Sequence, residues 1–211
     1  MQKNGNGPGG WVDVERGLVS REAFTSDDVY RQEMSRIFDR TWIYLAHESE
    51  IPSPGDYAVR QLGSAPVIVV RDDGGQIRVM LNSCRHRGTK LCRADAGRID
   101  NITCPFHGWT YQRGGALITT GFDNYFPDGT DFSELGLVHA PRVDSFHGLI
   151  FACWEPDVID LTDYLGDIGW YLTAFFDRTP DGMEVLAPPH RWRTRANWKI
   201  GSLNFIGDRQ H

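Results

Sequence analysis

The middle of the chain alternates short apolar runs with turn residues, as antiparallel β-strands do. Gly63-Ser64 and Asp72–Gly75 provide turns between successive runs. This spacing predicts an antiparallel β domain over about residues 41–156. The strand-like runs are Asp56–Leu62, Pro66–Val70, Ile77–Asn82, Asn101–Cys104, Trp109–Gln112 and Leu149–Trp154.

Both ends of the chain carry apolar residues at helical spacing. Ser26–Trp42 is predicted to be a packing helix, with Thr25 and Asp28 as its N-terminal capping pair. Leu161–Phe176 is predicted to be a second helix. His190–Arg195 alternates bulky and basic residues like a strand, and Gly121–Val143 has the composition of a long surface loop.

The composition narrows the class of protein. The 211 residues are 40% hydrophobic and 24% charged, which is typical of globular domains with a normal core. The net charge is -6 and there is no basic block, so nucleic acid is not an expected partner. No apolar run approaches the length of a membrane span, and no export leader precedes the β domain, so we expect a cytoplasmic protein.

Two short motifs each place one cysteine beside one histidine. The first is Cys84-Arg85-His86-Arg87-Gly88, and the second is Cys104-Pro105-Phe106-His107-Gly108-Trp109. A hairpin between the motifs can bring both pairs to one point. The resulting two thiolates and two imidazoles suit either a tetrahedral zinc ion or a Rieske [2Fe–2S] cluster.

The spacing favours the cluster. Zinc modules usually place like ligands together, as Cys-x2–4-Cys and His-x3–5-His. Here each motif supplies one ligand of each kind, so each loop can reach both irons of a cluster that has sulfur ligands on one iron and nitrogen ligands on the other. A structural zinc site stays open as an alternative. A disulfide between Cys84 and Cys104 is less favoured, because nothing indicates export.

Cys-x-His-Arg-Gly followed by Cys-x2-His-Gly-Trp resembles the Rieske motif of the aromatic ring-hydroxylating dioxygenases, in their large (α) subunit. The resemblance implies that Cys84 and Cys104 bind one iron of a [2Fe–2S] cluster and that His86 and His107 bind the other. Trp109 is expected to shield the cluster. The implied fold is α+β: an all-β antiparallel Rieske domain flanked by helices, followed by the start of an α+β catalytic domain.

A second pattern lies near the end of the sequence, after Asn197-Trp198-Lys199. On a helix Asn204, Asp208 and His211 would share one face, which taken alone indicates a solvated polar stripe or a pocket. The resemblance implies more. It makes His211 a ligand of a mononuclear non-haem Fe(II), Asp208 the carboxylate that links the two metal sites, and Asn204 a residue at the substrate pocket.

The resemblance also implies an organisation and an activity. Residues 1–40 would be a tail and helix that pack with the catalytic domain, 41–156 the Rieske domain, and 157–211 the first part of the catalytic domain. Electrons from NAD(P)H would arrive through a reductase, a ferredoxin or both. The mononuclear iron would then use O2 to cis-dihydroxylate an aromatic substrate, in an α3 or α3β3 oligomer.

Two other classes of protein stay open. The second iron ligand histidine and the carboxylate ligand of the family are not in this sequence, so we expect it to represent a fragment with an incomplete catalytic iron site. Such a chain could behave as a Rieske-type electron carrier. A zinc-stabilised binding module is the third hypothesis, and the identity of the metal separates it from the other two.

Overall fold

The computed structural model describes residues 11–191 and 194–207 of the chain. The described residues divide into two compact units: a smaller one on either side of the middle of the chain, up to residue 37 and from residue 188, and a larger one of residues 38–187. No helix within the described ranges is long and apolar enough to cross a membrane.

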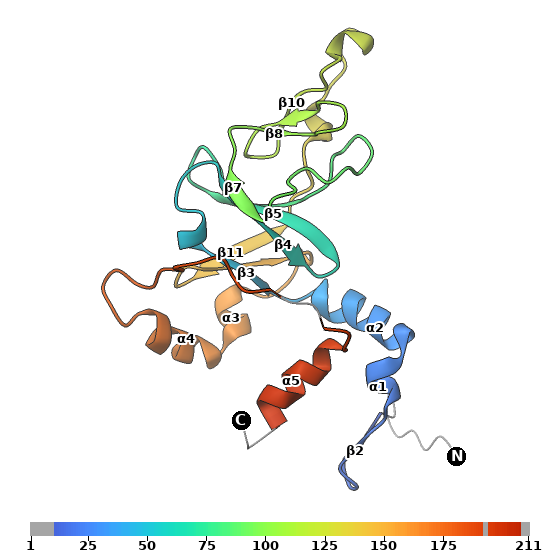
Figure 1. The fold of residues 1–211 in the computed structure, drawn as a ribbon, viewed down its shortest axis with the longest axis vertical. Coiled ribbons are helices and arrows are strands. Elements are labelled where there is room, and N and C mark those ends of the chain that lie inside the picture. Colours follow the sequence, from blue (N-terminus) through green and yellow to red (C-terminus); the bar gives the residue numbers. More distant parts are fainter. Residues whose placement is uncertain (1–10, 192–193, 208–211) are drawn as a thin grey trace. The chain divides into compact units, whose positions relative to one another are not determined.

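The larger unit is built on a central four-stranded antiparallel sheet in the order β6-β5-β4-β7 (Figure 1). Its strands are β4 (Asp56–Leu62), β5 (Ala65–Arg71), β6 (Ile77–Leu81) and β7 (Ala96–Arg98). Tyr57 pairs with Val70 and Leu62 with Ala65, so β4 and β5 are in register along their whole length. The predicted strand Asp56–Leu62 is confirmed at both ends, and the next two predicted strands are confirmed within one residue at each end.

Both faces of this sheet are buried, because each face packs against a further sheet. Ile68 and Val70 of β5 join one core with Tyr111, Trp109 and the cysteines of the two motifs. Val67 and Val69 point to the other face and join a second core, whose members include Leu45, Ile150 and Ala152. Burial on two sides explains why this strand is a continuous apolar run instead of an alternating one.

The two outer sheets have three strands each. One has the order β10-β9-β8, with β8 at Ile102–Thr103, β9 at Thr110–Tyr111 and β10 at Leu117–Thr119. The other has the order β11-β12-β3, with β3 at Ile43–His47, β11 at Arg142–Phe146 and β12 at Leu149–Cys153. Short 3-10 helices occur at η2 (Glu48–Glu50), η3 (Asp123–Tyr125) and η4 (Ser133–Leu135).

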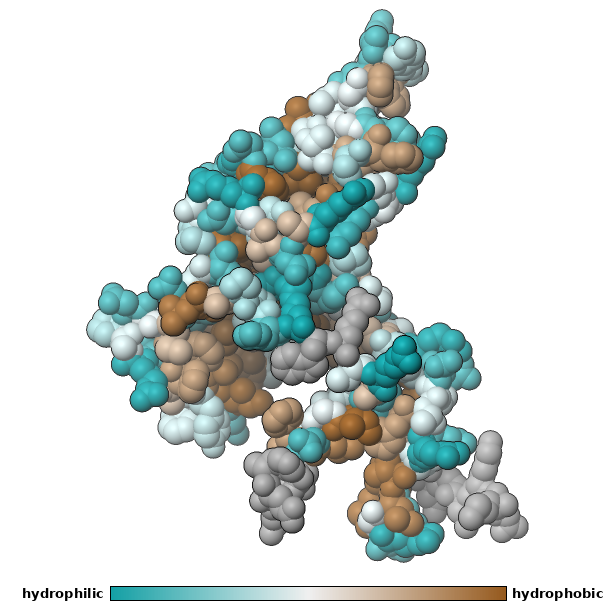
Figure 2. All heavy atoms as spheres, viewed as in Figure 1, coloured by the Kyte–Doolittle hydropathy of each residue, from teal (hydrophilic) through white to brown (hydrophobic). Residues whose placement is uncertain are grey.

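The helix predicted over Leu161–Phe176 is in fact two helices, α3 (Leu161–Leu165) and α4 (Ile168–Phe176). Gly166 between them has φ +48°, outside the right-handed helical region, so the first helix ends there. Glycine adopts this conformation at little cost. Ile168, Trp170, Tyr171 and Phe175 of α4 are exposed, and Figure 2 shows apolar side chains gathered over this part of the unit.

The smaller unit contains the hairpin of β1 (Val12–Asp13) and β2 (Leu18–Val19) and three helices. The helices are α1 (Glu22–Thr25), α2 (Asp27–Glu33) and α5 (Trp198–Gly207), and η1 (Met34–Phe38) continues α2 as a π-helical turn. The prediction that Thr25 caps the helix was wrong. Ser26 is the N-cap, and its side chain accepts a hydrogen bond from the Val29 N–H at 3.4 Å.

Two further sequence predictions were also wrong. The helix predicted to reach Trp42 ends at Phe38, and the described residues of His190–Arg195 are not in a strand; residues 192–193 lie outside the described ranges. The α+β class, with antiparallel sheets flanked by helices, is confirmed.

Candidate metal centre

The two cysteine–histidine motifs fold into loops with the same backbone hydrogen bonds. The Cys84 N–H donates to the Thr89 carbonyl at 2.9 Å, and the Cys104 N–H donates to the Trp109 carbonyl at 2.7 Å. In each loop the glycine four positions after the cysteine donates back to the cysteine carbonyl, at 2.9 Å for Gly88 and 3.1 Å for Gly108. The two cysteines are therefore presented by equivalent tight turns.

The glycines of the motifs have a conformational role in these turns. Gly88 has φ +74° and Gly108 has φ +75°, in the left-handed region where a side chain would introduce strain. This requirement explains why a Gly follows the histidine of each motif, two positions after His86 and directly after His107. The positive φ values are therefore a sufficient reason for glycine in His-Arg-Gly and in His-Gly-Trp.

The two histidines of the motifs come together from the two loops, and the two cysteines belong to one buried core. Cys84 and Cys104 are both 3% exposed, within the core between the central sheet and the β10-β9-β8 sheet. The Nδ1 atoms of His86 and His107 lie 3.1 Å apart, with the ring centroids at 4.7 Å and the rings at 69°. The thiols are thus held inside, and the two imidazoles meet nearer the surface.

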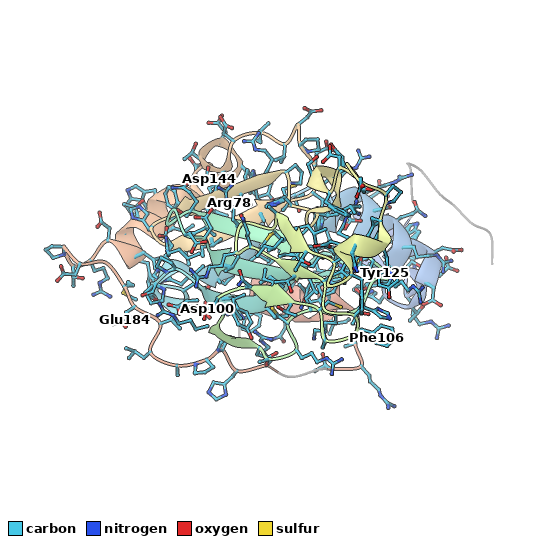
Figure 3. The ribbon with its side chains drawn as sticks, turned by 90° about the horizontal axis from the view of Figure 1, so that it is seen from above. Arg78, Asp100, Phe106, Tyr125, Asp144 and Glu184 are labelled. Carbon is cyan, nitrogen blue, oxygen red and sulfur yellow. The ribbon has the colours of Figure 1, made fainter. Side chains whose placement is uncertain are left out.

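Aromatic side chains surround the two imidazoles. Trp109 is buried and stacks on His86, with centroids 5.2 Å apart and an interplanar angle of 8°. Phe106 contacts His107 at a centroid distance of 4.1 Å and is 65% exposed, at the periphery of the view in Figure 3. One imidazole is therefore covered by a buried ring, and the other is bordered by an exposed ring.

The electrostatics favour neutral imidazole at His86. Desolvation, followed by the nearby charge of Arg87 and the neighbouring His107, lowers the pKa of His86 below its usual value. A neutral imidazole is the form that binds a metal. The ring nitrogens that face each other at 3.1 Å are close enough to bind one ion, given metal–nitrogen bonds of about 2.0–2.1 Å.

Tyr111 contacts a motif cysteine, and the sequence pattern did not predict this contact. The Tyr111 hydroxyl lies 3.3 Å from Cys84 Sγ and accepts a hydrogen bond from the Arg85 N–H at 3.1 Å. Tyr111 is fully buried, and its pKa is raised, first by burial and then by the hydrogen bond to Cys84. In the sequence it appears only as an aromatic residue two positions after Trp109, in a predicted strand.

The other cysteines and histidines lie apart from this centre. Cys92 and Cys153 are buried, burial raises the pKa of both thiols, and that of Cys92 rises to about 11. All four cysteines are free thiols. Among the described residues, no three His, Cys, Asp or Glu side chains gather closely enough to hold a single metal ion.

The second candidate site is described only in part. Asn204 is exposed on α5, whereas Asp208 and His211 lie outside the described residues. The Asn-Trp-Lys segment has a packing role within the smaller unit, since Trp198 Nε1 donates to a Glu33 carboxylate oxygen at 2.9 Å and Lys199 pairs with the other oxygen. Asn197 and Trp198 also line a shallow hollow of about 370 Å³ with residues of α1 and α2.

Comparison with known proteins identifies the domain around the two loops. Residues 41–124 match the profile of the Rieske [2Fe-2S] domain, and this range contains Cys84, His86, Cys104 and His107. The larger unit carries a Rieske domain. A domain of this type binds a [2Fe–2S] cluster, so the Rieske fold and its cofactor predicted from the motifs are confirmed.

The similarity extends over nearly the whole chain. It is 42% identical over 199 residues to the N,N-dimethyl phenylurea N-demethylase α subunit of Sphingobium sp. (strain YBL2), covering 94% of the chain and 43% of that relative. It is 40% identical over 200 residues to the biphenyl 2,3-dioxygenase α subunit of Rhodococcus jostii (strain RHA1), covering 95% of the chain and 43% of that relative. The chain is a homologue of these Rieske oxygenase large subunits.

The solved structures agree. The naphthalene 1,2-dioxygenase from Rhodococcus sp. bound to indole superposes with a TM-score of 0.87 at 42% identity, over 92% of this chain and 44% of that one. A quaternary ammonium Rieske monooxygenase in complex with L-carnitine superposes with a TM-score of 0.78 at 27% identity, over 88% of this chain and 51% of that one. The chain thus spans less than half the length of its curated relatives, over their N-terminal portion.

Proposed function

We propose that Cys84 and Cys104 bind one iron of the Rieske cluster and that His86 and His107 bind the other. The observation that carries this assignment is the 3.1 Å approach of the two Nδ1 atoms from equivalent loops. The donor set fits the cofactor, because two thiolates and two neutral imidazoles are the ligands of a Rieske centre. When bound, the cluster supplies one-electron transfer at a higher potential than an all-cysteine cluster.

The residues of the chain position the ligands and favour the metal-binding form of His86. Burial keeps the Cys84 and Cys104 sulfurs away from water, and two matching turns position them. The lowered pKa of His86 favours its neutral imidazole. Trp109 covers one face of that imidazole, which excludes water from this side of the centre.

For the whole protein we propose the activity of an oxygenase α subunit. In that activity the Rieske domain would take electrons from a ferredoxin or reductase, and a mononuclear Fe(II) would supply the O2 chemistry for cis-dihydroxylation of an aromatic ring. His211 is a ligand of that iron, Asp208 connects the two metal sites, and Asn204 borders the substrate pocket. Relatives named as biphenyl and naphthalene dioxygenases support this proposal, because the similarity to them covers 95% and 93% of this chain.

The same comparisons favour a second reaction. One relative at 42% identity is named as a phenylurea N-demethylase, so oxidative removal of an N-methyl group is a candidate alongside ring dihydroxylation. Analysis of products by mass spectrometry separates the two. Dihydroxylation adds both oxygen atoms of 18O2 to a biphenyl or naphthalene ring, whereas N-demethylation of a dimethylphenylurea yields the monomethyl compound.

The ligand assignment is tested by paired substitutions in the 211-residue chain. His107→Ala and Cys104→Ala should abolish bound iron and acid-labile sulfide. His190→Ala and Cys92→Ala remove the same groups from an exposed and from a buried position outside the loops, and should leave both contents unchanged. Retention of iron by the His107 and Cys104 variants, or stoichiometric zinc in the unsubstituted chain, would contradict the assignment.

The electron-carrier alternative is tested with the same chain. We expect the isolated 211 residues to accept electrons from dithionite without consuming O2 in the presence of an aromatic substrate. Substrate-dependent O2 uptake by the pure chain, with no added subunit, would overturn this expectation. In a longer protein that contains the remaining iron ligands, His211→Ala should abolish product formation while the Rieske spectrum stays unchanged.

A further inference from the structure

The side chain of Asn82 joins the entry and the exit of residues 84–89, the first ligand loop. Asn82 lies directly after β6 and is 1% exposed. Its backbone N–H donates to the carbonyl of Pro66 on β5 at 2.8 Å, which attaches Asn82 to the central sheet. Its amide oxygen accepts from the Leu91 N–H at 3.0 Å and the Cys92 N–H at 2.9 Å, and its amide nitrogen donates to the Cys92 carbonyl at 2.8 Å.

These three hydrogen bonds fix the orientation of the amide. The two N–H groups can only donate and the carbonyl can only accept, so the amide oxygen and nitrogen cannot be exchanged. Only backbone groups of Leu91 and Cys92 take part. All three bonds are buried, and a buried backbone group that loses its partner costs free energy. Removal of the Asn82 amide would therefore favour opening of the base of the loop.

The second ligand loop, residues 104–109, is closed in a different way. It lies at the tip of a hairpin, because β8 ends directly before it, β9 begins directly after it and the two strands pair. The first ligand loop lies between β6 and β7, which are the opposite edges of the central sheet and are separated by β5 and β4. These two strands cannot close that loop by pairing. The side chain of Asn82 makes the closure that strand pairing makes in the second loop.

We propose that Asn82 is a positioning residue for the Rieske cluster, which holds the first ligand loop in place against the second. This inference rests on the proposed function of Cys84 and His86 as cluster ligands. Among the described contacts the Asn82 amide bonds to no ligand atom, so it acts through the loop backbone. Residues that orient metal ligands from behind typically change metal affinity by about 10–100-fold when they are removed.

Asn82→Ala tests the proposal, and Asp72→Ala is the matched control. Asp72 is 7% exposed, and its carboxylate also accepts from two backbone N–H groups, those of Gly74 at 2.9 Å and Gln76 at 2.8 Å. It closes the turn between β5 and β6, which carries no proposed ligand. The measurements on the reduced 211-residue chain with its cluster are the rate at which a ferrous-iron chelator removes iron and the EPR g values.

We expect Asn82→Ala to release iron about tenfold faster and to shift or broaden the g values, because His86 moves relative to the second loop. Asp72→Ala should change neither quantity, even though it also lowers the stability of the fold. A purely structural role for Asn82 would lower stability in both variants and leave both sets of g values alike. That result would overturn the inference.

A conservative pair of variants keeps the test valid if the alanine protein does not fold. Asn82→Asp retains the two accepted hydrogen bonds and, when ionised, loses the donated one, whereas Asp72→Asn makes the reverse exchange in the control turn. Iron release should be faster than in the unsubstituted chain for Asn82→Asp and unchanged for Asp72→Asn. Equal rates in these three proteins would overturn the inference alone. An unsubstituted chain without a Rieske EPR signal would instead overturn the ligand assignment, so the two failures are distinguishable.

Discussion

The imidazole of His86 lies flat against the indole of Trp109, with centroids 5.2 Å apart and planes within 8° of parallel. Trp109 is 8% exposed and belongs to the core that also contains Cys84 and Cys104. One side chain thus packs the core and covers a proposed iron ligand. This relationship gives the last residue of the second motif a physical role that its position in the sequence only suggested.

Trp109→Ala should destabilise the Rieske domain and raise the cluster potential. Loss of a buried Trp costs about 3–5 kcal/mol of unfolding free energy, and water admitted beside His86 stabilises the extra charge of the reduced cluster. Denaturant unfolding and redox titration measure the two effects. Trp170→Ala is the control, because Trp170 is 68% exposed on α4. Identical stability and potential in the two variants would contradict the shielding role of Trp109.

Glu33→Ala should loosen α5 within the smaller unit. Glu33 is hydrogen-bonded to Trp198 Nε1 and paired with Lys199, and both members of the ion pair are largely buried at 13% and 19% side-chain exposure. Loss of a partner of this kind costs about 1–3 kcal/mol. Amide hydrogen exchange in Trp198–Gly207 should therefore accelerate. Asp28→Ala removes an exposed carboxylate paired with Arg31 on the same helix and should leave that exchange rate unchanged.

Gly148→Ala should destabilise the β11–β12 hairpin more than Gly182→Ala destabilises its own turn. Both glycines have positive φ, at +81° and +70°, so the backbone strain is similar. A Cβ at Gly148 would lie 2.4 Å from His47 Nε2, whereas nothing lies within 4 Å of a Cβ at Gly182. The difference between the two unfolding free energies isolates the clash with the buried His47. Equal losses would mean that His47 moves without cost.

Cys92 should make unfolding easier at alkaline pH. Its pKa is raised to about 11 in the folded protein, above the value of about 8.5 for a free thiol. The neutral thiol is therefore favoured by folding, and this stabilisation is complete below about pH 8.5 and is lost as the pH rises through about 11. Cys92→Ala should flatten that part of the curve of unfolding free energy against pH. An unchanged slope in the variant would contradict this account.

The sequence predicted those elements whose apolar pattern reflects burial on both sides. Asp56–Leu62 was found with its bounds because the cores on the two faces of the central sheet bury both sides of this strand. Arg142–Phe146 was missed because it is an edge strand with two exposed and three half-buried residues, which leaves little pattern to read. Leu161–Phe176 was read as one helix because periodicity alone does not register the positive φ of Gly166.

In the candidate site, too, some residues could be predicted from the sequence and others could not. The spacing of the two motifs was enough to name the candidate ligands Cys84, His86, Cys104 and His107. A pair of short loops that each carry one thiol and one imidazole is typical of a Rieske centre. Tyr111 could not be predicted, since its hydroxyl reaches Cys84 only through the pairing of β9 beside the ligand loops. Asp208 and His211 were named by resemblance. They stay predictions, as do the roles of the four motif residues as cluster ligands and the domain boundaries at 41 and 157.

The measurement that tests the central claim most directly is the EPR spectrum of the dithionite-reduced 211-residue chain, recorded beside His107→Ala. We expect a rhombic Rieske signal, distinct from that of an all-cysteine cluster, in the unsubstituted chain and its loss in the variant. An EPR-silent chain with stoichiometric zinc, or a spectrum that His107→Ala leaves unchanged, would contradict the assignment of these two loops as the holders of a [2Fe–2S] cluster.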